Sequence, residues 1–332
     1  MLRRMQVSLS GLLEQLEKYR IESEFLLVDW NSPPDKPPVK DVVAWPRGLR
    51  YCTVRVIEVP PSIHRRYRHH KNIPMHATVA VNSGIRRARG EFILPGTIDL
   101  LYSNTLASFI GSKSLKGHLR YRTDRCDVNR AVLQCESLTE QLDYCDKNII
   151  HIHALKANPD DVLPPLHTNA CGDFQLMSRH YWHLLRGYRE AEIAAAFVDG
   201  LLSYASYTAG VTEVVLGEGM KLYHIDHDDK FSDRLKVRQS RFEELMGNGF
   251  IPHSFSRKLI ALWRLVAGEP ASEVYRIPTL SFAEYRKICA EMIAGKRSYI
   301  FNDESWGLGR DELKEALIAV AEWDHDWDAD TP

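Results

Sequence analysis

The feature that most constrains the fold is a strand, helix, strand succession in the first third of the chain. Residues Thr53–Val59 (TVRVIEV) are β-branched and alternating, which predicts a strand that ends at the two prolines after it. Residues Met75–Arg89 carry small and apolar side chains on one helical face and stop at Gly90, a residue typical of a helix end. Glu91–Leu94 predicts another short strand. Because this alternation joins parallel strands through crossover helices, the sequence predicts an α/β fold.

The segment before this unit predicts a further helix and strand. Leu12–Tyr19 has apolar residues at helical spacing, and Phe25–Val28 is a short all-apolar run typical of a buried strand. Residues 29–34 (DWNSPP) contain asparagine and proline, which predict a loop at the carboxyl end of that strand. Ligands of open α/β sheets bind at such ends, so we expect part of a binding site there.

The rest of the chain changes character at about Ser240. Before this residue the pattern predicts a strand-rich segment Arg120–Cys135, a strand Phe174–Leu176, a helical turn Arg179–Leu185, a helix Ile193–Ala209 and strands Val211–Leu216 and Met220–His224. After it the pattern is helical and amphipathic, with prolines between segments. We therefore expect one main domain over residues 1–240 and a helical C-terminal extension over residues 241–332.

Composition excludes several classes of protein. The 332 residues carry a formal net charge of −1, so we expect no nucleic-acid partner. Two short basic segments, HRRYRHHK at 64–71 and RRARG at 86–90, are typical of a solvated surface, with phosphate binding as the alternative. Six scattered cysteines without a CxxC pair predict no zinc knuckle or disulfide framework and favour the cytoplasm. No apolar run approaches the ~20 residues that span a bilayer, so any membrane association would be peripheral, at its inner face.

Several motifs follow one another in a defined order. Residues 82–92 (NSGIRRARGEF) precede Ile98 and Asp99, and residues 28–32 read VDWNS. Residues 172–179 (GDFQLMSR) are followed by RGY at 186–188, by Asp199 and by HIDH at 224–227. This order resembles the family 2-like glycosyltransferases of the GT-A fold, which carry V-D-x-x-S, N-x-G-x-x-x-A-x-G, D-x-D and G-x-F-x-x-x-R…GY motifs. The resemblance spans roughly residues 10–230.

The resemblance implies a fold and an activity. The fold would be a GT-A type, Rossmann-like mixed sheet, mainly parallel and flanked by helices, over residues 1–240. The activity would be transfer of a sugar from a nucleotide diphosphate, with a UDP-sugar favoured, to a glycan acceptor of the surface polysaccharide or lipopolysaccharide type. The reaction would be inverting and assisted by Mn²⁺ or Mg²⁺, because a divalent cation stabilises the charge that develops on the departing phosphate.

Two departures from the family pattern stand out. Members of the family open with a strand whose loop embraces the nucleotide base, whereas this chain runs from Met1 directly into its first helix. We expect either that the base pocket lacks one wall or that the true start lies upstream. Thr97-Ile98-Asp99 occupies the place of D-x-D, so a single motif carboxylate remains to hold the metal.

The candidate donor site is built around that carboxylate. Asp99 with His224 or His227 is a coherent ligand set, because manganese accepts both carboxylate oxygen and imidazole nitrogen. The alternative is that Asp99 forms a turn and that the histidines are ordinary strand-end imidazoles. The other residues that the resemblance assigns to the nucleotide sugar lie in the two amino-terminal motifs: Asp29, Asn31, Asn82 and Arg86. Asp29 in a local turn and Arg86 on a solvated helix surface are the alternatives for two of them.

The candidate acceptor side centres on Asp199, which occupies the place of the family's catalytic base. A carboxylate there would take the proton of the acceptor hydroxyl; the alternative is that Asp199 caps the helix beside Gly200, with Glu190 or Glu192 as the substitute base. The acceptor-side motif implies four further contacts: Asp173, Gln175, Trp182 and Tyr188. The two aromatic residues would form a platform for a sugar ring or, as the alternative, would pack in the core.

Two other functions compete with glycosyl transfer. A non-catalytic protein that binds sugar nucleotides or acts as a scaffold would explain the absent first strand and the thinned acidic motif. A nucleotidyltransferase would be expected to carry a glycine-rich phosphate loop near its amino terminus, and this sequence has none. Residues Phe301–Leu308 form a polar-aromatic segment that we expect to close over the donor site as a lid.

Overall fold

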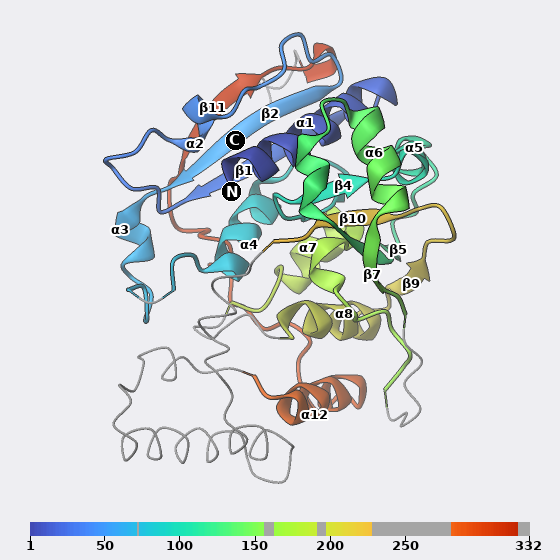
Figure 1. The fold of residues 1–332 in the computed structure, drawn as a ribbon. Helices are drawn as coiled ribbons and strands as arrows, with labels where there is room; N and C mark the ends of the chain where they lie inside the picture. The colour runs from blue at the N-terminus through green and yellow to red at the C-terminus, as the bar shows by residue number, and fades with distance from the viewer. Residues whose placement is uncertain (72, 156–162, 191–196, 228–279, 325–332) are drawn as a thin grey trace, which may run out of the picture.

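The chain is a mixed α/β protein in which three sheets are flanked by helices (Figure 1). The computed structural model describes residues 1–71, 73–155, 163–190, 197–227 and 280–324. Glu192 and the predicted domain boundary near Ser240 lie outside the described residues. Among the described residues, no helix has both the length and the apolar composition needed to span a bilayer.

The first sheet has the strand order β1-β2-β11. Strand β1 (Ser23–Trp30) runs parallel to β2 (Cys52–Val59), and β11 (Lys314–Ala319) pairs antiparallel with β2. Helix α4 (Ala77–Arg87) packs on β1, and a Cβ atom at Gly84 would lie 3.3 Å from a methyl group of Val28. These elements confirm the two strands and the helix predicted in the amino-terminal part.

The second sheet carries the candidate metal ligands. Its order is β4 (Leu100–Tyr102), β10 (Leu222–Ile225), β6 (Arg125–Val128) and β7 (Ile149–His153). The third sheet has the order β3 (Phe92–Ile93), β8 (Leu176–Ser178), β5 (Leu119–Arg122) and β9 (Thr212–Val215). Only β1–β2, β6–β10 and β5–β9 are parallel pairs among the described strands, and the other five pairs are antiparallel. The expectation of one mainly parallel sheet was therefore wrong. Helix α4 was expected to join two parallel strands, but β2 and β3 lie in different sheets, and β3 pairs antiparallel with β8.

Helix α1 (Leu2–Lys18) lies between the first and second sheets. Its Ser8 hydroxyl donates to the carbonyl of Leu100 at 2.5 Å and accepts from the Leu100 amide at 2.9 Å. Two turns further on, the Gln15 amide donates to the carbonyl of Tyr102 at 2.7 Å. Polar side chains of a helix thus satisfy backbone groups of β4 that a neighbouring strand would otherwise satisfy.

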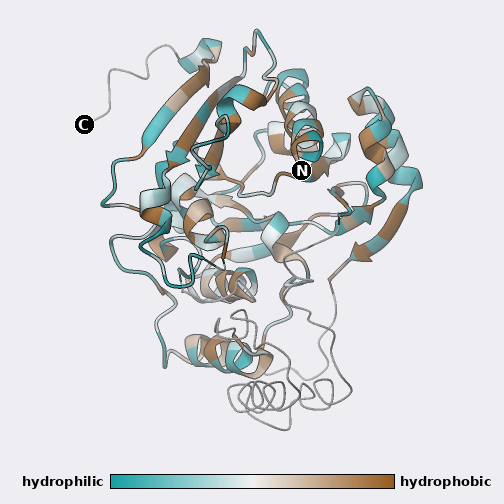
Figure 2. Ribbon diagram, turned by 60° about the vertical axis from the view of Figure 1, so that its left-hand side comes forward, coloured by the Kyte–Doolittle hydropathy of each residue, from teal (hydrophilic) through white to brown (hydrophobic). Residues whose placement is uncertain are grey.

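Helices α7 (Arg179–Leu185) and α8 (Val198–Thr208) contact the third sheet, and α12 (Phe282–Ile293) packs on α8. Helix α12 begins with a capping box formed by Ser281 and Glu284 and turns an apolar face toward the core, as the alternation of colours in Figure 2 illustrates. The other helices among the described residues are short or peripheral, namely α2 (Val39–Val42), α3 (Pro61–His64), α5 (Asn104–Gly111), α6 (Leu138–Lys147), η1 (Arg130–Gln134), η2 (Cys171–Asp173) and η4 (Glu322–Asp324).

The segment after α12 returns to the first sheet, so the expected all-helical extension was wrong in its last part. Arg86 donates to the carbonyls of Glu304 and Trp306 at 3.1 and 3.0 Å. Arg87 donates to the carbonyls of Gly307, Leu308 and Asp311 at 2.8 to 3.0 Å. The chain then enters β11 and pairs with β2. The segment expected as a lid is therefore fixed to α4 by several hydrogen bonds.

Candidate metal and donor site

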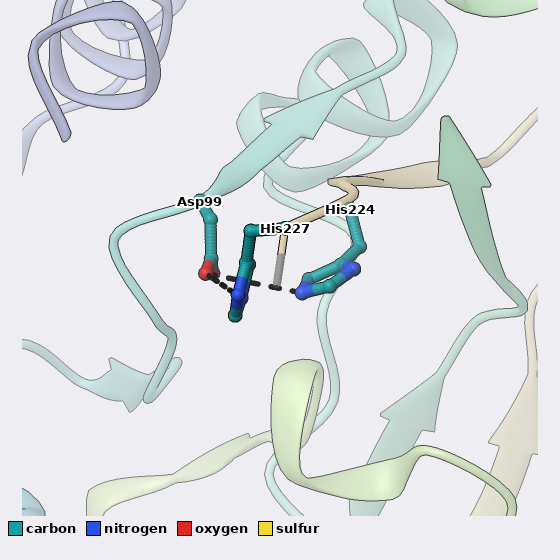
Figure 3. Close-up of side chains that lie close together, drawn as sticks. All are labelled: Asp99, His224 and His227. Atoms are coloured by element: carbon teal, nitrogen blue, oxygen red, sulfur yellow. Dashed lines mark ion pairs between the residues drawn. The ribbon is translucent and has the colours of Figure 1, made fainter. Parts of the chain in front are cut away.

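One carboxylate and two imidazoles converge at the junction of β4 and β10 (Figure 3). Asp99 immediately precedes β4, His224 lies in β10 and His227 follows that strand. The antiparallel register pairs His224 with Leu100, and the Ile225 amide donates to the Asp99 carbonyl at 2.9 Å. This pairing brings together the three residues that the sequence proposed as metal ligands.

The distances between these groups suit a metal ion after a small adjustment. Nε2 of His227 lies 3.0 Å and Nε2 of His224 lies 3.8 Å from Oδ2 of Asp99, and the three ligand atoms lie within 4.8 Å of one another. Two ligand atoms that each bind a cation at about 2.1 Å, with angles of about 90 to 110°, are about 3.0 to 3.4 Å apart. The His227–Asp99 distance meets this condition, and His224 requires a shift of about 0.5 Å.

The chemistry of the donor set narrows the choice of metal. Two imidazole nitrogens and one carboxylate oxygen suit Mn²⁺, Fe²⁺ or Zn²⁺, whereas Mg²⁺ prefers oxygen ligands and retains several waters. The three side chains are 8, 15 and 25% exposed for Asp99, His224 and His227, so the site faces solvent mainly through the histidines. Of the two metals expected from the sequence, Mn²⁺ fits these residues better than Mg²⁺.

A carboxylate behind His224 fixes the orientation of its ring. The parallel register of β10 and β6 sets His224 beside Asp127, and His224 Nδ1 lies 3.1 Å from Asp127 Oδ1. A proton on Nδ1 leaves Nε2 free to ligate the metal, which is how outer carboxylates orient metal-bound histidines. The other Asp127 oxygen lies 2.8 Å from Nε2 of His153. Burial raises the pKa of Asp127, but the hydrogen bond from His153 and the positive charge of Arg125 outweigh this effect and lower the pKa.

Sequence reasoning missed Asp127, His153 and Arg125. Arg125 and Asp127 are two residues apart on β6, and therefore project to the same face of a strand. His151 and His153 repeat this spacing on β7. Charged residues at alternate positions of a predicted strand could have indicated a polar face. Their link to the metal site could not be predicted, because His224, the partner of Asp127, lies almost a hundred residues away.

We expect Asp127→Asn to weaken Mn²⁺ binding by about ten- to a hundredfold, because the amide no longer holds His224 in one tautomer and orientation. Calorimetric titration of the purified protein with Mn²⁺ measures this change. The lowered pKa of Asp127 also makes its ionised form stabilise the native state at any pH above the ordinary carboxyl value near 4. The stabilisation by ionised Asp127 is lost as the pH falls from about 4 through the lowered pKa. Over this pH range the free energy of unfolding should therefore fall less in Asp127→Asn than in the wild-type protein.

Asp146→Asn is the matched control for this variant. Asp146 also accepts hydrogen bonds from residues of the β10 region, Tyr223 at 2.7 Å and Lys221 at 2.8 Å, but within the described part of the chain no contact joins it to the metal ligands. Equal Mn²⁺ affinities for the two variants would contradict the orienting role of Asp127.

A chain of polar contacts links the metal ligands to the candidate acceptor side. Arg125 contacts Asp127 at 3.0 Å and donates to Oδ2 of Asp173 at 2.8 Å. Asp173 ends η2, whose Gly172 amide donates to Oδ2 of Asp199 at 2.9 Å. The Gly200 amide donates to the other Asp199 oxygen at 2.9 Å. Asp173 and Asp199 therefore belong to one connected network with the metal ligands, at the first turn of α8.

The other acceptor-side candidates lie inside the protein. Gln175 is fully buried, accepts from Arg120 at 3.0 Å and donates to the Asp199 carbonyl at 3.2 Å. Trp182 is fully buried and donates to the Ile93 carbonyl at 3.1 Å. Tyr188 is 6% exposed and packs against Trp182 with ring centroids 5.3 Å apart. Burial raises the pKa of Tyr188. In this conformation the two aromatic residues form core and present no platform to a sugar.

Asn82 and Arg86 also have internal partners. The Asn82 amide group donates to the Tyr188 carbonyl at 2.7 Å and to Glu190 at 2.9 Å, and its oxygen accepts from the Tyr188 amide at 2.8 Å. Gly187 has a φ of +68°, and a Cβ atom there would lie 2.2 Å from the Asn82 oxygen. Asn82 thus holds the turn around Gly187, and Arg86 holds the segment before β11, with its guanidinium 5.2 Å from the Trp306 ring centre.

Asp29 and Asn31 form the turn at the carboxyl end of β1. The Ser32 hydroxyl donates to one Asp29 oxygen, and the Val39 amide donates to the other at 3.3 Å. Asn31 adopts a left-handed φ of +58°, a conformation that asparagine tolerates well. Val39 belongs to an apolar cluster that also contains Ile98, the residue before Asp99. The turn and the metal ligands therefore flank the same cluster, although no direct contact joins them among the described residues.

Comparison with known proteins adds no family to these observations. The chain matches no protein-family model, and no curated protein matches it at a significant level.

Proposed function

We propose that this protein is an inverting glycosyltransferase that uses Mn²⁺ and a nucleotide diphosphate sugar, with a UDP-sugar favoured and a glycan as acceptor. The observation that carries the proposal is the convergence of Asp99, His224 and His227, residues far apart in sequence that the motif order had marked as the metal site. Membrane contact at the inner face, for an acceptor of surface polysaccharide type, is part of the same proposal.

In this proposal Asp99, His224 and His227 hold the metal, and Asp127 keeps His224 in the ligating tautomer. The cation, when bound, stabilises negative charge on the departing phosphate. Arg125 joins Asp127 to Asp173 and so fixes the position of η2 relative to the metal ligands. This network fixes η2 against Asp199, in the first turn of α8.

Asp199 is the proposed base of the reaction. The acceptor hydroxyl oxygen bonds to the anomeric carbon, the bond between that carbon and the phosphate oxygen breaks, and the hydroxyl proton moves to Asp199. Attack opposite the departing diphosphate inverts the configuration. Two carboxylate oxygens offer about four acceptor sites, and the Gly172 and Gly200 amides and the Cys171 thiol use three of them, which leaves one for the acceptor proton.

One observation favours the non-catalytic alternative. Both Asp199 oxygens accept backbone amides, the arrangement of a carboxylate that holds a loop against a helix end. In that case the protein would bind a sugar nucleotide and release it unchanged.

The test is thermal stabilisation of the purified chain by UDP, GDP, CDP and ADP, each with Mn²⁺, Mg²⁺, Zn²⁺ or chelator. We expect one nucleotide to raise the melting temperature with Mn²⁺ and little or not at all with Mg²⁺, because binding to the native state alone stabilises it. Hydrolysis or transfer of the matching radiolabelled nucleotide sugar then separates an enzyme from a binding protein. Absence of any nucleotide-dependent shift contradicts the proposed function.

A further inference from the structure

Helix α1 adds a positive charge to the metal site that the family motifs do not include. We propose that Arg4 contacts the diphosphate of the bound nucleotide and supplies the second positive charge of the donor site. This inference rests on the proposed function and deepens it, because it assigns the phosphate recognition to a residue outside every motif found in the sequence. Arg4 Nε lies 3.6 Å from Oδ2 of Asp99, the same oxygen that both histidines approach.

The guanidinium of Arg4 has an unused donor at this position. Its Nε atom is buried and has no hydrogen-bond partner among the described residues. The 3.6 Å separation from Asp99 is too long for a hydrogen bond, although it is short enough for a strong electrostatic attraction. A buried charged donor without an acceptor is costly, and a phosphate oxygen is the acceptor that a guanidinium matches best.

Helix α1 is fixed firmly enough to position this side chain. Ser8 and Gln15 bind the backbone of β4, as described above, and Arg3 donates to the Leu133 carbonyl at 2.8 Å through Nε. Met5, next to Arg4, is buried in the apolar cluster that contains Ile98. The contacts of α1 with β4 and with this cluster therefore hold Arg4 close to Asp99.

The charges of the site support the same conclusion. A D-x-D motif with two carboxylates and a divalent cation has no net charge. Here Thr97 replaces one carboxylate, its hydroxyl donating to Oδ1 of Asp99 at 2.6 Å, and Arg4 adds one positive charge. With a divalent cation and histidines that are neutral when they ligate it, the site carries two positive charges, which balance the two negative charges of a nucleotide sugar diphosphate. The departing nucleoside diphosphate carries more negative charge and should be held more tightly than the donor.

A purely structural role for Arg4 makes a different prediction. If Arg4 only neutralises Asp99, its removal also lets the metal bind more tightly, but it leaves diphosphate affinity unchanged once the metal is bound. If Arg4 contacts the diphosphate, its removal has two effects of opposite sign. The metal alone binds more tightly, because a like charge beside its ligand is gone, while the diphosphate binds less tightly.

The experiment compares Arg4→Met and Arg4→Lys with the wild-type protein, with Arg3→Met as the control on the same helix. Mn²⁺ binding is measured from the electron paramagnetic resonance signal of the free ion. Binding of UDP and of inorganic pyrophosphate is measured by calorimetry at saturating Mn²⁺. We expect Arg4→Met to bind Mn²⁺ about three- to tenfold more tightly and both diphosphates at least about tenfold more weakly. Arg4→Lys should lie between, because it keeps the charge without the planar donor group.

Pyrophosphate makes this test independent of the nucleotide base. A wild-type protein that binds Mn²⁺ but neither UDP nor pyrophosphate contradicts the proposed function, and with it this inference. A wild-type protein that binds both, together with an Arg4→Met variant that binds them equally well, overturns the inference and leaves the proposed function standing. A similar loss in the Arg3→Met control would also overturn it, because the effect would then come from the helix and not from Arg4.

Discussion

The Asp99→Ala variant is expected to bind Mn²⁺ at least about a hundredfold more weakly than the wild-type protein and to lose all manganese-dependent stabilisation by nucleoside diphosphates. Residues that only orient metal ligands change affinity by about ten- to a hundredfold, and Asp99 is the sole carboxylate among the three candidate ligands. Its Oδ2 atom is the point at which both histidines and Arg4 converge. Calorimetric titration with Mn²⁺, with and without UDP, measures both effects.

This variant needs a control for local damage. The Asp99 side chain is only 8% exposed, and its removal takes away the carboxylate that Arg4 faces. An uncompensated buried charge costs on the order of 3 to 5 kcal/mol when fully buried, and less at a site that is partly open. Asp99→Asn retains the shape and the hydrogen bond from Thr97 while it removes the charge. Mn²⁺ affinity that is unchanged in Asp99→Asn would exclude this cluster as the metal site, whatever the stability of the alanine variant.

The candidate metal cluster was accessible from the sequence because its residues lie at strand ends in a recognisable order. Asp99 follows a predicted strand and loop, and His224 ends the predicted strand Met220–His224. The pairing of β4 with β10, which brings Asp99 at the amino end of β4 close to His224, was not predictable from local patterns. Whether the cluster binds metal stays a prediction.

The position of α1 beside β4 could not be predicted. Its sequence indicates an amphipathic helix, but the hydrogen bonds of Ser8 and Gln15 to β4 depend on partners about ninety residues away. The same applies to β11, whose residues Lys314–Ala319 have no strong alternation and become a strand through pairing with β2. A local sequence pattern indicates which side chains are buried and whether a segment is helical or extended. The positions of α1 and β11 depend instead on contacts with distant segments.

The acceptor-side candidates show the limit of motif transfer. Trp182 and Gln175 match the positions of a sequence motif, yet both are fully buried and bonded inside the protein. A motif residue near a site can be retained for packing as well as for binding, and the sequence does not distinguish these roles. Their contacts separate them here: Asp173 and Asp199 belong to the network that reaches the metal ligands, and the aromatic pair does not.

The Asp199→Asn variant is expected to bind Mn²⁺ and UDP with wild-type affinity while its kcat falls by about a thousandfold. An amide cannot take the acceptor proton, and general base catalysis contributes about 10² to 10⁴ in rate. The substitution also replaces one acceptor by a donor, so one of the Gly172 and Gly200 amides loses its partner at a cost of about 1 to 3 kcal/mol. Turnover is therefore measured well below the melting temperature of the variant.

Glu190→Gln separates Asp199 from Glu190, two of the three carboxylates that the sequence offered as the base. Glu190 accepts from the Asn82 amide group at 2.9 Å and from the Gly307 amide at 2.7 Å, and a glutamine oxygen can accept both. Burial raises the pKa of Glu190 despite these hydrogen bonds, so the neutral variant should fold at least as well at neutral pH. Full turnover in Glu190→Gln with loss in Asp199→Asn identifies Asp199 as the base. The reverse result assigns the base to Glu190 and leaves Asp199 as the residue that ties η2 to the first turn of α8.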